Sequence, residues 1–344
     1  MATDISEQPE AFARLVAPGS AARIAEVAAV VAARRPRHVM LTARGTSDHA
    51  ALYGAYLAEI RLALPAGLGS PSTVTLFGTQ ADYSKALVIG VSQSGRSPDL
   101  CELVKAARKS GATTVAITNE PDSLLAQNAE LVIHLDAGVE RALPATKTYT
   151  TELLALLMLI EGVRAGDGRL PEPEASFLAT LPELAARLLE DDGAEPIASR
   201  LRFVDSLVIT GRGYGYPTAR EAAHKIMETS YLPALAYSGA DLLHGPLAVT
   251  APRVPVLAVV GQGPGGVAMS EVVARLAARQ SEVTVVSSTD VAGAHDRLHV
   301  PGVDERYSPL LDILPLQRLT LALAVTRGNN PDAPEGITKV TPTR

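Results

Sequence analysis

The sequence of 344 residues has a single cysteine, Cys101. This excludes a disulfide framework and any metal cluster built on cysteine ligands. An excess of basic side chains is also missing, because 31 Lys and Arg stand against 37 Asp and Glu and leave a net charge of −6. That balance argues against a broad surface for nucleic acid or membrane. We therefore expect neither partner, although a few local donors can still bind one phosphate.

Targeting segments, long apolar runs and cofactor motifs are absent as well. The N-terminus carries no basic stretch followed by an apolar core, so it is not a secretory signal. The most apolar segments, 153–160 and 254–260, are too short to span a bilayer. No histidine or carboxylate cluster indicates a metal, and the glycine-rich fingerprints of nucleoside triphosphate and dinucleotide sites are missing. We expect a cytoplasmic globular chain without a cofactor.

The sequence predicts strands that alternate with helices. The chain is long enough for two domains, or three. Apolar strands are expected at 39–42, 74–77, 86–91, 113–117 and 131–135. Helices are expected over residues 1–35 and at 50–61, 98–109 and 150–163. Strands that are apolar on both faces indicate a parallel sheet with helices on each side.

The same pattern restarts in the second half of the chain. Residues 41–45 are matched by 209–213 at an offset of 168, and residues 91–95 by 260–264 at an offset of 169. Coincidence between short glycine-rich strings is the alternative, but the agreement of the two offsets favours a duplicated α/β unit. We therefore divide the chain into a helical segment 1–35, a first α/β domain 36–165, a linker with helices 166–200, a second α/β domain 201–328 and a tail 329–344.

The turn at residues 92–99 is a candidate anion site. It follows an apolar strand and opens a helix, with Ser97 predicted as N-cap and Pro98 at the first helical position. Free N–H groups, three serines and Gln93 suit a phosphate monoester; an ordinary capped helix is the alternative. In the second copy Gly261, Gly263 and Gly266 replace Ser92, Ser94 and Ser97, and Gly215 replaces Ser47. Only the first copy is therefore expected to hold an anion.

Two further segments offer groups for acid–base chemistry. On the helix expected from Pro217, Glu221, Lys225 and Glu228 fall within about 60° of one another. Glu followed by Lys four residues later is also the usual surface ion pair of a helix. The alternative to an acid–base site is therefore an ordinary solvated helix face. His244 stands in an irregular loop, where it is either a proton-transfer group or an ordinary turn residue. Lys339 lies in a polar tail and is unremarkable unless that tail folds back over the site.

Together these segments resemble the sugar isomerase (SIS) family, and most closely the isomerase half of glucosamine-6-phosphate synthase. The resemblance covers nearly the whole chain. It is carried by residues 5–9, Arg44-Gly45-Thr46-Ser47, Ser92-Gln93-Ser94-Gly95, residues 145–150, the spacing Glu221-x-x-x-Lys225-x-x-Glu228, residues 243–247 and Lys339.

The resemblance implies two tandem SIS domains, each a parallel sheet flanked by helices in a three-layer, flavodoxin-like αβα fold. It implies that Glu228 moves a proton between C1 and C2, that His244 assists ring opening, and that Lys339 holds the open-chain sugar while Lys225 stabilises the enolate oxygen. It also implies a homodimer with shared active sites, covered by the C-terminal tail. The residues it assigns to the sugar 6-phosphate are Thr46, Ser47, Ser92, Gln93, Ser94 and Ser97, and Gly45 and Glu221 are its further substrate contacts.

The chain also departs from the synthase. Residue 2 is alanine, where the synthase has the cysteine that releases ammonia from glutamine, so we expect no glutamine-dependent synthesis. Arg96 replaces an acidic residue of the synthase turn. The first hypothesis is an amino-sugar 6-phosphate isomerase and deaminase that forms a ketose 6-phosphate and ammonia. The alternatives are a dehydratase acting on an N-acetylhexosamine 6-phosphate and a sugar-phosphate sensor without turnover. The sequence leaves glucosamine, N-acetylglucosamine, galactosamine and fructosamine phosphates open as substrates.

Overall fold

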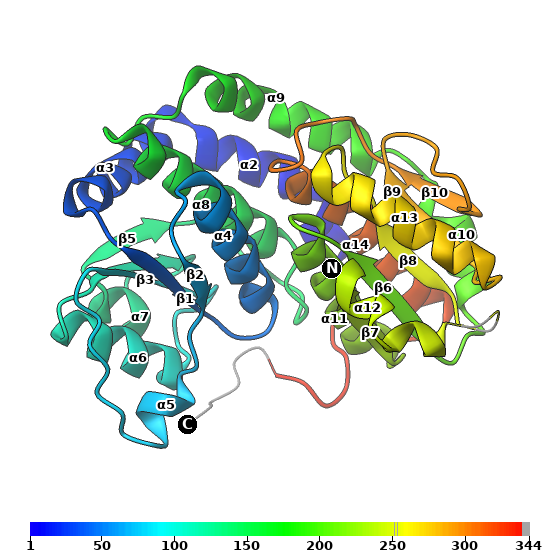
Figure 1. The fold of residues 1–344 in the computed structure, drawn as a ribbon, viewed down its shortest axis with the longest axis horizontal. Helices are drawn as coiled ribbons and strands as arrows, with labels where there is room; N and C mark the ends of the chain where they lie inside the picture. The colour runs from blue at the N-terminus through cyan, green and yellow to red at the C-terminus, as the bar shows by residue number, and fades with distance from the viewer. Residues whose placement is uncertain (251, 253, 339–344) are drawn as a thin grey trace. The chain divides into compact units, whose positions relative to one another are not determined.

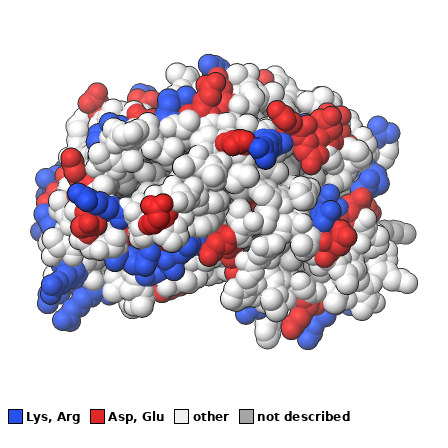
Figure 2. Space-filling model, turned by 90° about the horizontal axis from the view of Figure 1, so that it is seen from above, with Lys and Arg blue, Asp and Glu red and all other residues white. Residues whose placement is uncertain are grey.

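The structure is a computed structural model that describes residues 1–338 except 251 and 253. Its chain forms two compact units. The N-terminal unit comprises Glu7–Glu140 and Lys147–Pro182, and the C-terminal unit comprises Met1–Ser6, Arg141–Thr146 and Glu183–Ile337. On the face drawn in Figure 2, basic and acidic side chains are interspersed.

The N-terminal unit is built on a five-stranded parallel sheet in the order β2-β1-β3-β4-β5 (Figure 1). All residues of β3 and β4 are buried, as expected for central strands with helices on both faces. Helices α3, α4 and α8 cover one face and α6 and α7 the other. The strands are β1 (His38–Thr42), β2 (Ala66–Leu68), β3 (Ala86–Val91), β4 (Thr113–Thr118) and β5 (Leu131–His134). The helices are α2 (Gln8–Val16), α3 (Pro18–Arg34), α4 (Thr46–Arg61), α5 (Ser72–Thr75), α6 (Pro98–Lys109), α7 (Leu124–Asn128) and α8 (Lys147–Ala165).

The C-terminal unit repeats this topology. Its parallel sheet has the order β10-β9-β8-β6-β7, which is the order of the first sheet when β6 is matched to β1 and β8 to β3. Helices α10, α11 and α14 pack together, and α12 and α13 pack together with β8 and β9 around a second apolar core. The strands are β6 (Leu207–Gly211), β7 (Ala234–Ser238), β8 (Val256–Val259), β9 (Val283–Ser287) and β10 (Asp296–His299). The helices are α1 (Ala2–Ser6), α10 (Ala194–Leu201), α11 (Gly215–Ser230), α12 (Gly239–Leu243), the 3-10 helix η1 (Pro246–Val249), α13 (Pro264–Ala278) and α14 (Pro309–Thr326), and α9 (Glu172–Leu189) spans the boundary between the units.

The predicted fold class is therefore confirmed: two parallel sheets flanked by helices form a duplicated three-layer α/β fold. The strand order matches the flavodoxin-like order 2-1-3-4-5. Identical strand order in both sheets also confirms that the repeated turns reflect a duplication and not a coincidence.

One expected element is wrong, and one begins earlier than expected. The predicted strand at 74–77 is the short helix α5 (Ser72–Thr75), in which no residue is buried. Its β-branched residues suggested a strand, but the edge of β1 is already paired with β2, a short segment that the sequence did not indicate. The helix predicted from residue 50 begins at Thr46, so Thr46 and Ser47 belong to its first turn.

The expectation that no segment is long and apolar enough to cross a membrane overlooked α14. This helix of 18 residues passes that test by length and composition, but 72% of its apolar window is buried inside the protein. Its N-terminal half is almost entirely buried. The core helix of a globular protein has this character, and α14 packs against α10 and α11 in its own unit.

Candidate functional site

The predicted phosphate-binding residues lie in two turns that follow neighbouring central strands. Thr46 and Ser47 come after β1, and Ser92 comes directly after β3, which pairs with β1 in parallel. In the order 2-1-3-4-5 the connections from these two strands leave toward opposite faces, so a crevice forms at their carboxyl ends. The structure therefore brings the two predicted turns to the position where open α/β sheets bind ligands.

The β3–α6 turn is organised by its own serines. The Ser92 hydroxyl oxygen accepts the N–H of Gly95 at 3.1 Å, and Ser94 Oγ accepts the N–H of Arg96 at 3.4 Å. Gly95 has φ +59°, and a Cβ there would lie 2.1 Å from Ser123 Oγ. Ser97 is the N-cap of α6 as predicted, yet its hydroxyl makes no capping hydrogen bond. At the start of α6, Pro98 has no N–H and the N–H of Leu100 donates to Oδ1 of Asp99 at 2.9 Å.

An ion pair that the sequence did not reveal joins the two turns. Arg44 follows β1, and its Nη2 and Nε atoms lie 2.7 and 2.9 Å from Oδ2 of Asp99, in the first turn of α6. Asp99 is buried, while the Arg44 side chain is 47% exposed. This bridge fixes the β1–α4 turn against α6. It also compensates the charge of Asp99, which would otherwise repel an anion at the helix start.

Ser47 is held from a third element. Its hydroxyl donates to Oε1 of Glu152 on α8 at 2.7 Å, and both side chains are buried. The proton of Ser47 is therefore engaged in this structure, and a phosphate oxygen must compete with Glu152 for it. Sequence patterns did not indicate Glu152, because the residue stands inside a strongly apolar helix.

Gln93 and Ser94 also line a cavity of about 560 Å³ beside the turn, at the carboxyl ends of β3, β4 and β5. Asn119 and His134 contribute to its wall. Asp136, in the same wall, lies 2.8 Å from Nδ1 of His134 and forms an ion pair with Arg23 at 2.7 Å. This cavity places polar side chains next to the predicted phosphate turn.

The corresponding turn of the second copy already contains an anion. The carboxylate of Glu305 accepts the N–H groups of Gly265 and Gly266, at 3.1 and 2.9 Å, at the start of α13. A Cβ on Gly263 or Gly265 would lie within 2.6 Å of that carboxylate. Of the glycines that replace serines, Gly263 is thus required by the close approach of Glu305, whereas a Cβ on Gly266 would lie 1.7 Å from the backbone oxygen of Gly261.

The helix α11 carries the predicted acid–base residues, and they do not form a solvated face. Glu221 and Lys225 are buried, and Glu228 is 19% exposed in its side chain. Lys225 Nζ forms an ion pair with Glu228 and lies 3.8 Å from Oε1 of Glu221. The surface alternative is therefore wrong, because α11 packs on α14 and three strands of its sheet. Met227, expected on the opposite face from these residues, is 44% exposed.

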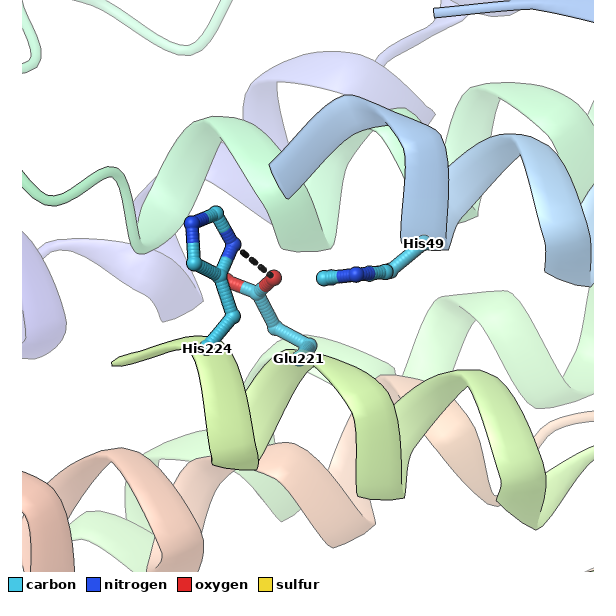
Figure 3. Close-up of side chains that lie close together, drawn as sticks. All are labelled: His49, Glu221 and His224. Carbon is cyan, nitrogen blue, oxygen red and sulfur yellow. Dashed lines mark ion pairs between the residues drawn. The ribbon is translucent and has the colours of Figure 1, made fainter. Parts of the chain in front are cut away.

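A histidine completes this cluster, and sequence reasoning missed it. His224 Nε2 lies 3.2 Å from Oε1 of Glu228. Its Nδ1 lies 3.8 Å from Oε2 of Glu221, the ion pair that Figure 3 draws. Burial lowers the pKa of His224, but the neighbouring carboxylates of Glu221 and Glu228 outweigh this effect and raise the pKa to about 9. His224 follows Glu221 by three residues and precedes Glu228 by four, so the same helical spacing could have found it.

The electrostatics of Glu228 follow from these neighbours. Burial raises the pKa of the Glu228 carboxyl, but the hydrogen bond from His224 and the charge of Lys225 prevail and lower it. Glu228 is accordingly an ionised carboxylate flanked by two cations near neutral pH. Such a group can accept a proton, and a cation beside it can stabilise a developing oxyanion.

The remaining predicted residues lie elsewhere or outside the described part. His244 is the C-cap of α12 and is exposed, and the loop predicted around it includes that helix and η1. Among the described residues its side chain has no hydrogen bond or ion pair with the α11 cluster. Gly45 is the N-cap of α4 with φ +57°, a conformation that favours glycine. Lys339 lies outside the described residues.

Two of the segments that carried the resemblance contact each other. Lys147, at the start of α8, is fully buried and forms an ion pair with Glu7. Three residues later, Thr150 donates its hydroxyl proton to Gln8 Oε1 at 2.9 Å. Glu140 accepts the N–H and the hydroxyl proton of Thr148 and so caps α8. These residues hold the beginning of α8 against α2.

Comparisons with known proteins agree with this architecture. The family model of the SIS domain matches residues 34–162 and 201–326. Glutamine–fructose-6-phosphate aminotransferase (isomerizing) of Pyrobaculum aerophilum is 34% identical over 98% of this chain and 56% of its own length. The chain thus spans about half the length of that curated relative.

Solved structures extend the similarity. A provisionally named phosphosugar isomerase of Silicibacter pomeroyi is 34% identical with a TM-score of 0.89, over 96% of this chain and 99% of that one. The C-terminal domain of glucosamine-fructose-6-phosphate aminotransferase from Francisella tularensis has a TM-score of 0.84 at 24% identity, over 96% of this chain and 97% of that domain. The latter similarity shows the shared fold.

Proposed function

Because the chain belongs to the SIS domain family, we propose that it is a sugar-phosphate isomerase that acts on an amino-sugar 6-phosphate and releases ammonia. The observation that carries the proposal is the α11 cluster, in which the Glu228 carboxylate is held ionised beside Lys225. A carboxylate with an adjacent cation is what proton abstraction next to a carbonyl requires.

The phosphate end of the substrate is assigned to the N-terminal unit. Ser92, Ser94 and Ser97 offer hydroxyls around Gln93 at the start of α6. A helix N-terminus favours a dianion, and hydroxyl donors complete its coordination. Thr46 and Ser47, in the first turn of α4, are the corresponding donors from the neighbouring turn, and Gly45 lets the backbone approach. In the second copy Glu305 occupies the equivalent place, which supports a single phosphate site per chain.

The reaction is assigned to Glu228. In the open-chain amino sugar it takes the proton from C2, and the electrons of that C–H bond form a C1–C2 double bond while the carbonyl electrons move to O1. Lys225 stabilises the resulting negative charge. Glu228 then returns the proton to C1, a proton passes from the nitrogen to O1 through solvent, and an imine remains at C2. Water hydrolyses this imine to the ketose 6-phosphate and ammonia.

Three further residues have proposed roles that rest on the family resemblance. Glu221 pairs with Lys225 across one helical turn and is proposed to contact the substrate. His244 is proposed to assist ring opening, and Lys339 to hold the open-chain sugar.

The test is a substrate panel with a matched pair of variants. The protein is incubated with glucosamine, galactosamine, N-acetylglucosamine and fructosamine 6-phosphates, and ammonia and product masses are recorded. Glu228→Gln should reduce turnover at least 100-fold while sugar-phosphate binding persists. Glu271→Gln is the control, because Glu271 is an exposed glutamate of α13 in the same unit.

Each outcome of this panel has a defined meaning. Ammonia release that is lost in Glu228→Gln supports the proposal. An 18-dalton loss from the acetylated sugar would replace deamination by dehydration, and binding without turnover would make the chain a sensor. Unchanged turnover in Glu228→Gln would remove Glu228 as the base.

A further inference from the structure

Four charged groups on α11 form a closed ring of alternating sign. Glu221 approaches both His224 and Lys225 at 3.8 Å. Glu228 in turn contacts His224 at 3.2 Å and forms an ion pair with Lys225. Each carboxylate therefore has two basic neighbours and each base has two acidic ones. The helical spacing of three and four residues makes this closure possible on one face.

The charge of this ring depends on His224. Glu221 and Lys225 are buried, and the side chains of His224 and Glu228 are only 25% and 19% exposed. With His224 protonated the ring holds two cations and two anions and is neutral. With His224 neutral, the ring would hold two carboxylates and the one cation of Lys225 in a poorly solvated place, which is costly.

His224 also determines how Glu228 is held. Its Nε2–H points to Oε1, while Lys225 takes Oε2, so each carboxylate oxygen has its own cationic donor. Such charge-assisted bonds are short and directional. Without His224, Oε1 of Glu228 loses its cationic donor and the carboxylate can rotate.

We propose that His224 is a positioning residue for the proton transfer, which acts through Glu228 by fixing its carboxylate and supplying the second cation of the ring. This inference rests on the proposed function, because it takes Glu228 as the base. It adds a residue of the C-terminal unit to those that the reaction requires, and it assigns to that residue a charge as well as a hydrogen bond.

The test compares two substitutions at this position with a control histidine. His224→Gln keeps a hydrogen-bond donor but removes the charge, and His224→Lys keeps a positive charge. We expect kcat to fall 10- to 100-fold in His224→Gln with KM changed less than twofold, and at least a tenth of the wild-type kcat to return in His224→Lys. His299→Gln should be unaffected, because His299 is an exposed residue of β10 in the same unit. Equal kcat in His224→Gln and wild type would overturn the proposal, as would a loss confined to KM.

A second measurement needs no activity. The imidazole of His224, assigned by the signal lost in His224→Gln, is titrated by NMR in the wild type and in Glu228→Gln. We expect it to remain protonated at pH 7.5 in the wild type and to titrate at lower pH in Glu228→Gln. Titration at the ordinary value for histidine in the wild type, or no change in Glu228→Gln, would overturn the ring. A wild type without turnover on any sugar phosphate contradicts the proposed function, and this titration still decides whether His224 holds Glu228.

Discussion

The carboxylate of Glu305 lies 2.9 Å from the backbone nitrogen of Gly266, in the first turn of α13. In the duplicated fold this is the counterpart of the turn that opens α6, where the first copy has serines in place of glycines. The second copy thus satisfies its helix start with an anion from its own chain, and we propose that the first copy keeps the equivalent place for a ligand. The same turn thus stabilises a helix in the second copy and is proposed to bind a phosphate in the first.

Replacing this carboxylate should destabilise the protein. In Glu305→Ala the N–H groups of Gly265 and Gly266 lose their acceptor, and loss of such a cap costs about 1–2 kcal/mol. The free energy of unfolding is measured by urea titration, with Glu271→Ala, in the middle of the same helix, as the control. Equal stability of the two variants would show that Glu305 does not hold α13.

The serines of the first copy should act on phosphate and not on the sugar. Ser92→Ala combined with Ser94→Ala removes two hydroxyls from the turn, and a hydrogen bond to a charged group contributes about 1.5–3 kcal/mol. The double variant should therefore weaken binding of a sugar 6-phosphate roughly 100-fold or more, measured by calorimetry.

The matched control for this pair is Ser110→Ala. Ser110 lies at the C-terminal end of α6, and its hydroxyl donates to the backbone carbonyl of Ala81. Affinity for the same sugar without its phosphate should be unchanged in the double variant. A parallel loss for both sugars would contradict the assignment of these serines to the phosphate.

The sequence predicted the two sheets, their duplication and the phosphate turn, because these depend on local patterns. Apolar runs mark buried strands, and glycine and serine mark the turns that follow them. The helix at Ser72–Thr75 was missed because its β-branched residues favour a strand, and only the pairing of β1 with β2 decides otherwise.

Other features depend on contacts between distant segments. The bridge from Arg44 to Asp99 joins residues 55 positions apart, and the bond from Ser47 to Glu152 joins residues 105 positions apart. No local pattern encodes such pairs. The burial of Lys225 could likewise not be predicted from the sequence, because an isolated helix with this spacing would expose Lys225 to solvent.

Asp312 should make the protein less stable as the pH rises. Burial raises the pKa of the Asp312 carboxyl to about 7. A hydrogen bond from Ser308 lowers this pKa, and the charge of Glu305 raises it further. The ordinary value is 3.8, so between pH 4 and 7 the folded chain keeps a proton that the unfolded chain has lost. Stability therefore falls across this range, by at most about 4 kcal/mol, and levels off above it.

Asp312→Asn removes this dependence. Relative to the wild type, the variant should gain stability between pH 4.5 and pH 8 in urea titrations. Asp205→Asn, an exposed substitution in the same unit, should show no such gain. A constant difference between Asp312→Asn and wild type over this range would mean that Asp312 is ionised throughout.

His224 should also make the protein less stable as the pH rises, but over a higher pH range. Its pKa in the folded chain, about 9, is above the ordinary value of 6.5, so the folded state holds the proton more tightly than the unfolded state does. The stabilisation from protonated His224 is fully present below pH 6.5 and is lost as the pH rises through 9, with an upper limit of about 3 kcal/mol. The difference in unfolding free energy between wild type and His224→Gln should accordingly shrink between pH 6.5 and 9.5. His299→Gln serves again as the control, and a difference that does not change with pH would place His224 in the ring as a neutral side chain.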